Sequence, residues 1–153
     1  MNVNLLELKS ELINDPLSLG YSQYTSARND IECLNLLNEI RQGEDFLVSR
    51  GRITKDAFVE VTSFILLNLL QLSRGGNEDA QFLITVFNTL VANSETISVN
   101  DPALALVLDQ MLSLNFITEN DKISVLKRQG SRAEILFGTN VTLDQVSNSL
   151  NEG

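Results

Sequence analysis

The chain has 153 residues, about the length of one domain, and carries 11 Lys and Arg against 20 Asp and Glu, for a formal net charge of −9. Its 43% hydrophobic residues can form a buried core, which excludes an intrinsically disordered chain. The acidic excess argues against nucleic-acid binding, because that binding depends on clustered cations that neutralise phosphates. With no His and a single Cys, the sequence offers no His-based catalytic triad and no Cys/His zinc site.

Apolar residues spaced by three and four recur along the chain, and the alternation typical of β-strands is nearly absent. Capping residues, glycines and prolines mark where the apolar segments begin and end. We predict helices over residues 3–14, 30–39, 54–74, 77–91, 101–112, 118–129, 131–137 and 142–150. The sequence therefore predicts an all-α fold, a compact bundle of about seven to eight helices in a single helical domain over residues 1–153. Several helices are short, and at most a minor extended segment is expected, at residues 46–48.

The helix predicted over 54–74 is apolar almost all round. Such a helix lies in the middle of a bundle, or it gives one face to another subunit. Glu60 and Asn68 interrupt its apolar run, which falls short of the roughly 20 residues that a membrane span needs. We therefore expect a soluble chain that makes no contact with a membrane.

The turn DPLSLGY, residues 15–21, is the first candidate for a partner interface. In one interpretation the turn is exposed and Leu17, Leu19 and Tyr21 anchor a docking partner. In the other interpretation these three side chains pack beneath the first helix, and the proline and glycine only provide the geometry of the turn. The sequence favours the second interpretation and leaves the first open.

Three arginines complete the set of interface candidates. Arg50 and Arg52 belong to the one local excess of positive charge and could contact an acidic partner, or simply balance an acidic chain. Arg132 lies within a capping box formed by Ser131 and Glu134. It could contact a partner directly, although an ion pair beside a helix cap explains it more simply.

No residues are arranged for catalysis. Acidic pairs such as Glu78-Asp79 lie in first helical turns, where the helix dipole accounts for them. Gly75-Gly76 lacks the pattern of a phosphate-binding loop. Cys33 lies in an apolar helical stretch and is expected to be a small buried hydrophobe. We therefore expect no enzymatic activity, no cofactor, no metal ion and no small-molecule ligand.

Two parts of the sequence carry distinctive motifs. LKSELINDPLSLGY, residues 8–21, holds a helix followed by an Asp-Pro-Leu-x-x-Gly-Tyr turn. NDPALALVLDQMLSLNF, residues 100–116, is followed by GSRAEILFGTNVTLDQVSNSL, residues 130–150, with its Ser-Arg-Ala-Glu run and glycine turn. These motifs resemble the two ends of a family of small helical proteins encoded by tailed bacteriophages. In the turn, Ser18 and Leu19 stand where family members commonly have Gly or Ala and Arg.

The resemblance implies a component of the virion or of its assembly. It suggests a non-enzymatic structural subunit at the head–tail neck or connector, on the shell or in the tail, made in the host cytoplasm and then held in the virion. Such a subunit would dock onto other phage structural proteins and form a homo-oligomer within a symmetric assembly. The alternative is a transient phage assembly factor or a small helical regulatory adaptor.

Overall fold

The computed structural model describes residues 2–92 and 94–151, and the chain divides into two compact units. Unit 1 consists of Met1–Val48 and Gln129–Gly153, and unit 2 consists of Ser49–Arg128. Unit 2 is thus inserted into the sequence of unit 1, and each unit has its own hydrophobic core. The single domain expected over residues 1–153 stays a prediction.

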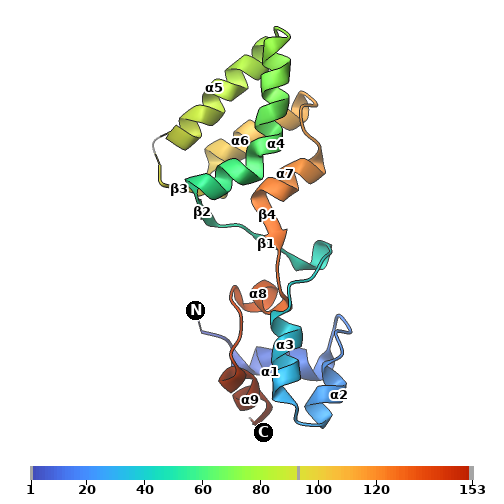
Figure 1. Ribbon diagram of the computed structural model, residues 1–153. Helices are drawn as coiled ribbons and strands as arrows, with labels where there is room; N and C mark the ends of the chain where they lie inside the picture. Colours follow the sequence, from blue (N-terminus) through green and yellow to red (C-terminus); the bar gives the residue numbers. More distant parts are fainter. Residues whose placement is uncertain (1, 93, 152–153) are drawn as a thin grey trace. The chain divides into compact units, whose positions relative to one another are not determined.

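The fold is all-α with minor extended segments, as predicted (Figure 1). The described ranges contain nine α-helices and four short strands. The helices are α1 (Leu5–Asn14), α2 (Tyr21–Ser26), α3 (Asp30–Asn38), α4 (Lys55–Arg74), α5 (Glu78–Ala92), α6 (Pro102–Ser113), α7 (Glu119–Leu126), α8 (Arg132–Phe137) and α9 (Leu143–Asn151). The strands are β1 (Leu47–Ser49), β2 (Arg52–Thr54), β3 (Thr96–Ser98) and β4 (Lys127–Gln129). A short 3-10 helix, η1 (Glu44–Phe46), precedes β1.

Side-chain caps fix where most helices begin, because a side-chain oxygen satisfies a backbone N–H that the first turn leaves unpaired. The predicted caps of α4, α5, α6, α7, α8 and α9 are confirmed, at Thr54, Asn77, Asp101, Thr118, Ser131 and Thr142. Three predicted boundaries are wrong. Helix α1 begins at Leu5, after its cap Asn4, and not at residue 3. Asn29 caps α3 in place of Asp30, and α7 ends at Leu126, so the chain is already extended before Gly130.

Helix α2 is not predicted from the sequence. Its six residues, YSQYTS, show no apolar stripe, and Gly20 before it has no side chain that could cap the helix. The fully buried side chain of Tyr21 holds α2 against the core of unit 1. The helix therefore depends on tertiary packing, which its own sequence does not reveal.

Unit 1 packs α1 against α2 and α9, and α3 against α8 and α9. Its core is formed by Leu8, Leu12, Tyr21, Cys33, Leu37, Ala133, Phe137, Val141 and Val146. The two sequence segments of unit 1 are also joined by hydrogen bonds. Asn38 donates to the carbonyl oxygen of Val141 at 2.8 Å and accepts from its N–H at 3.0 Å.

The turn between α1 and α2 is held by the carboxylate of Asp15. Its two oxygens accept from the backbone N–H groups of Leu19, at 2.6 Å, and Gly20, at 2.8 Å. Gly20 has φ +99°, a conformation that favours glycine because a Cβ would be strained there. The predicted turn over residues 15–21 is confirmed, and its shape comes from side-chain to backbone bonds as well as from Pro16.

Unit 2 is organised around the α4–α5 hairpin, against which α6 and α7 pack. Strand β2 pairs with β3 antiparallel, with Ile53 opposite Ile97. The rings of Phe58 and Phe87 stack with their centroids 5.4 Å apart. The core of unit 2 is formed by Phe58, Ile65, Leu69, Ala80, Leu83, Phe87, Ile97, Val99, Leu104, Val107, Leu108, Met111, Ile117 and Val125.

Helix α6 offers a direct test of this core, because Leu108 is fully buried whereas Leu106 is 71% exposed. We expect Leu108→Asp to unfold unit 2, since an unpaired carboxylate is very costly in an apolar core. The control Leu106→Asp should change the free energy of unfolding by about 0.5 kcal/mol or less. Urea titration followed by far-UV circular dichroism measures both, and a Leu108→Asp chain with full helicity would contradict the assigned core.

Candidate functional site

The predicted interface residues fall in both units. Unit 1 holds Leu17, Leu19, Tyr21 and Arg132, and unit 2 holds Arg50 and Arg52.

In unit 1, Tyr21 is fully buried, whereas Leu17 and Leu19 are half-buried. Leu19 packs against the core of unit 1. This arrangement agrees with the interpretation that places these side chains beneath the first helix. Tyr21 has no surface left for a partner, so it is no longer a docking anchor, while a docking role for Leu17 and Leu19 stays a prediction.

Arg132 makes a bidentate ion pair with Glu11 that joins α8 to α1. Its Nε donates to Glu11 Oε1 at 2.8 Å and its Nη2 donates to Oε2 at 3.1 Å. The side chains of Arg132 and Glu11 are only 13% and 4% exposed. The hydroxyl of Tyr21 lies 3.4 Å from Glu11 Oε1 and donates to it. The guanidinium is thus committed to a structural pair, with the capping box of Ser131 beside it.

The electrostatics of this cluster follow from burial and from the charge of Glu11. The hydrogen bond from Arg132 to Glu11 raises the pKa of the guanidinium, and the charge of the carboxylate adds to the shift. Burial raises the pKa of Tyr21 far above its ordinary value, and the charges of Glu11 and Asp15 raise it further. Both groups therefore keep their protons, so neither can act as a general base at neutral pH.

Cys33 is fully buried, as predicted. Burial raises the pKa of its thiol to about 11, and the charge of Asp30 adds to this shift. Because the thiolate is the reactive form, the thiol is inert near neutral pH.

In unit 2, both predicted arginines already have hydrogen-bond partners. Arg50 donates from Nε and Nη2 to the carbonyl oxygen of Ser124, at 3.1 and 2.9 Å. Burial lowers the pKa of Arg50, and the positive charge of Arg128 lowers it further. Arg52 donates from Nη1 to Thr96 Oγ1 at 3.1 Å, across the β2–β3 pair. A role of these two residues in docking stays a prediction.

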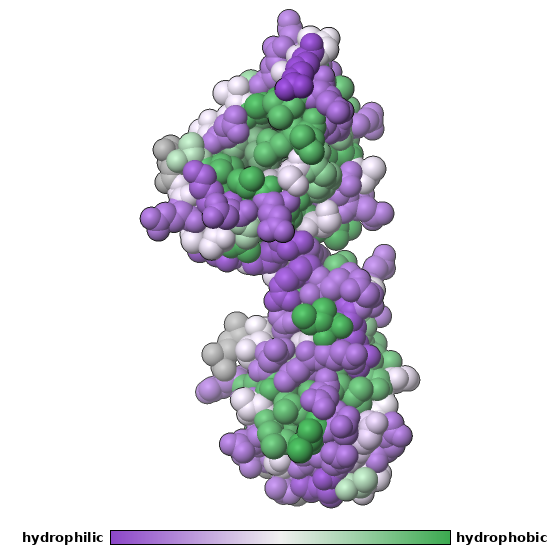
Figure 2. All heavy atoms as spheres, viewed as in Figure 1, coloured by the Kyte–Doolittle hydropathy of each residue, from purple (hydrophilic) through white to green (hydrophobic). Residues whose placement is uncertain are grey.

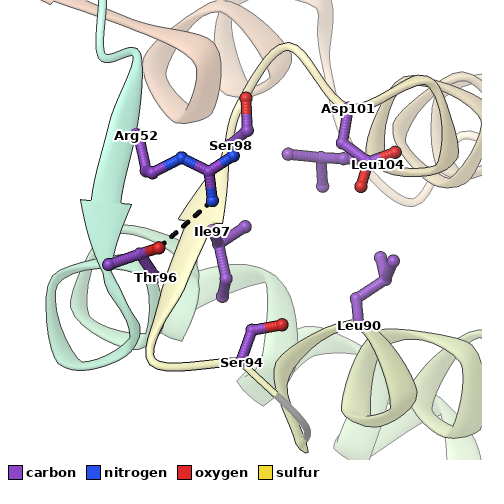
Figure 3. Close-up of a pocket in the computed structure, with 8 residues that line it drawn as sticks. All are labelled: Arg52, Leu90, Ser94, Thr96, Ile97, Ser98, Asp101 and Leu104. Carbon is purple, nitrogen blue, oxygen red and sulfur yellow. Dashed lines mark hydrogen bonds between the residues drawn. The ribbon is translucent and has the colours of Figure 1, made fainter.

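Arg52 borders a small hollow of about 110 Å³ between β2, β3 and the start of α6 (Figure 3). Polar groups on its wall come from Arg52, Ser94, Thr96, Ser98 and Asp101, and the remaining wall from Leu90, Ile97 and Leu104. The carboxylate of Asp101 accepts from the N–H of Ala103 as the cap of α6. The hollow has room for a few water molecules. It presents a guanidinium, hydroxyl groups and one carboxylate, which is already engaged in the helix cap.

Among residues 2–92 and 94–151, no three Cys, Asp or Glu side chains come together in a way that could hold a metal ion. The expectation that the protein uses no metal ion and no cofactor stays a prediction.

A more extensive feature of unit 2 is an apolar surface over α4 and α5 (Figure 2). Large hydrophobic side chains are exposed on α4 at Val59, Phe64, Leu67 and Leu70, and on α5 at Phe82. Helix α4 buries only one stripe, so it does not lie in the middle of a bundle. Contiguous exposed apolar surface of this kind is typical of an interaction site. The apolar composition of the segment is visible in the sequence, but which residues stay uncovered depends on the packing of α5 and α7.

Helix α4 is 20 residues long and is long and apolar enough, by length and composition alone, to cross a membrane. The expectation that this segment is too short for a span is therefore wrong as to length. Only 22% of the most apolar 18-residue stretch of α4 is buried. Core helices of soluble proteins can be equally long and apolar, so length and composition are weak evidence for a membrane span. The expected absence of a membrane partner stays a prediction.

In comparisons with known proteins, no family model matches the chain, and neither a curated protein nor a solved structure matches it. The resemblance to the phage family therefore depends on the two motif-bearing parts of the sequence alone.

The buried ion pair can be tested by removing one partner. We expect Arg132→Met to lower the free energy of unfolding of unit 1 by about 3 kcal/mol, because it leaves the buried Glu11 carboxylate unpaired. The double variant Glu11→Leu, Arg132→Met should recover most of the loss. Urea unfolding followed by tyrosine fluorescence reports on unit 1, which holds Tyr21 and Tyr24. If Arg132→Met lowers the free energy of unfolding by less than about 0.5 kcal/mol, the pair contributes no more than a weak surface ion pair does.

The protonation of Tyr21 gives a pH test. In a Tyr24→Phe variant, Tyr21 is the only tyrosine. We expect no phenolate absorbance from the folded variant when the pH is raised above 10.0, because Tyr21 stays protonated. The unfolded chain releases this proton near pH 10.0 and the folded chain does not. The stability that the shift contributes is therefore complete below pH 10.0 and is lost as the pH rises above it. The urea midpoint should be lower at about pH 10.5 than at about pH 8. Titration near pH 10.0 with native circular dichroism would show that Tyr21 is not buried.

Proposed function

We propose that this protein is a non-enzymatic structural subunit of a tailed-bacteriophage particle that acts by docking onto other structural proteins. The observation that carries the proposal concerns the residues of the resemblance. Residues 8–21 and 130–150 lie far apart in the sequence, and both belong to unit 1. The ion pair between Glu11 and Arg132 joins them directly. The resemblance thus includes the two halves of one folded unit, which supports a shared fold more strongly than two unrelated stretches would.

Two further properties support a docking role. Helices α4 and α5 present large exposed hydrophobic side chains, as a surface that awaits a partner does. The net charge of −9 would keep the free protein soluble before it assembles. The groups with shifted pKa values in unit 1 are protonated and engaged in the fold, which also favours a structural role.

The proposed partners are other phage structural proteins together with copies of this chain in a symmetric assembly. The protein would be made in the host cytoplasm and then reside in the virion, at the neck or connector, the shell or the tail. A transient assembly factor has the same docking chemistry but leaves before the particle matures. The two functions differ in whether the chain stays.

Quantitative mass spectrometry of purified particles tests this proposal. We expect the chain to be present in mature particles at a fixed copy number that matches a ring or shell symmetry. Particles purified through a second density gradient at high salt serve as the control for adsorbed protein. Absence from mature particles, with presence in assembly intermediates, would reject the structural subunit and favour the assembly factor.

A further inference from the structure

The outward side of α4 forms a stripe that the rest of unit 2 does not cover. We call it the α4 face and define it by Glu60, Phe64, Leu67, Leu70 and Arg74, all of which are exposed. Residues three, four and seven apart lie on the same side of an α-helix, so these five side chains line one surface. Leu67 occupies its centre and is 63% exposed.

Contacts on both sides of the helix mark the limits of the α4 face. On one side, the Gln81 side chain of α5 donates to the carbonyl oxygen of Ser73 at 3.2 Å. On the other side, Asn68 donates to the carbonyl oxygen of Phe116 at 2.8 Å. The α4 face lies between these two contacts and points away from the core residues Ile65 and Leu69.

The α4 face has nearly the same chemistry when it is read in either direction from Leu67. Three residues away on either side are the apolar Phe64 and Leu70. Four residues away are two polar side chains, Ser63 and Gln71. In an isologous contact residue i meets residue j and residue j meets residue i, so an antiparallel pair centred on Leu67 would bring apolar side chains onto apolar ones and polar side chains onto polar ones.

The charges differ in sign at the two ends of the α4 face. Seven residues before Leu67 is Glu60, and seven residues after it is Arg74, each about 10 Å from Leu67 along the helix. A parallel pair of α4 helices would bring Glu60 against Glu60 and Arg74 against Arg74. An antiparallel pair brings each glutamate beside the arginine of the other copy. The charges are therefore complementary in the antiparallel arrangement alone.

We propose that the α4 face binds the α4 face of a second copy of this chain, with the two helices antiparallel and the two-fold axis at Leu67. In this pair Leu67 packs on its own copy, Phe64 packs on Leu70 of the other copy, and Glu60 pairs with Arg74 twice. The inference rests on the docking role proposed above and names one partner for it.

Disulfide cross-linking tests both the contact and its direction. Leu67→Cys chains should link to each other under mild oxidation. Glu60→Cys chains should not link to each other, because their thiols would lie about 20 Å apart. A mixture of Glu60→Cys and Arg74→Cys chains should form a mixed disulfide. The native Cys33 is fully buried and does not compete. Self-linking of Glu60→Cys, with or without linking of Leu67→Cys, would overturn the antiparallel pair, because only a parallel or shifted arrangement brings two copies of residue 60 together.

Sedimentation over a concentration series tests the pair without cross-linking. The wild-type chain should reach twice its mass of 17.0 kDa, whereas Leu67→Glu should stay monomeric with unchanged circular dichroism. Leu106→Glu is the matched control, because Leu106 is as apolar as Leu67 and slightly more exposed but lies on α6, and it should dimerise like the wild type. Glu60→Arg should raise the dissociation constant about tenfold, and Glu60→Arg with Arg74→Glu should restore it.

The outcomes separate this inference from the proposed function. A wild-type chain that stays monomeric at every concentration overturns the pair, even when the protein is found in mature particles. A monomer that floats with phospholipid vesicles overturns it too and assigns the α4 face to a membrane surface. A dimer with the expected cross-links supports the pair, even when the chain is absent from particles and the structural-subunit role has failed.

Discussion

A carboxylate and a guanidinium that have lost most of their contact with water hold the two sequence segments of unit 1 together. Each charge of the Glu11–Arg132 pair is costly to bury alone, and their bidentate geometry offsets much of that cost. The pair therefore favours one arrangement of α1 against α8, because any other packing would leave a charge without its partner. Tyr21 adds a protonated hydroxyl to the same carboxylate and carries α2 into the core. The motif-bearing residues 8–21 and 130–150 thus close one folded unit.

Unit 2 uses its apolar residues differently. Helix α4 buries a stripe of Phe58, Thr62, Ile65 and Leu69 against the rest of the unit, and the opposite side is apolar as well. Contiguous exposed apolar surface of this kind is typical of interaction sites. The proposed self-pairing explains why this surface is apolar at its centre and oppositely charged at its ends.

Local features of the sequence are predicted well, and long-range pairings are not. The caps at Thr54 and Asp101 are signals carried within a few residues, and the structure confirms them. The pairing of β2 with β3 joins residues more than 40 positions apart, and neither segment is long enough for an alternation of apolar and polar residues to predict a strand. Glu11 looks like a solvated residue of an amphipathic helix, and its burial follows only from Arg132, 121 residues later. The outward direction of Leu67 likewise depends on where α5 and α7 pack.

The claim that the Glu11–Arg132 pair holds unit 1 together is tested most directly by amide hydrogen exchange in a Glu11→Gln variant, read by mass spectrometry. Because the two units have separate cores, we expect α1, α8 and α9 to lose protection together while α4, α5 and α6 keep theirs. Unchanged protection in α1 and α8, or an equal loss in both units, would contradict it.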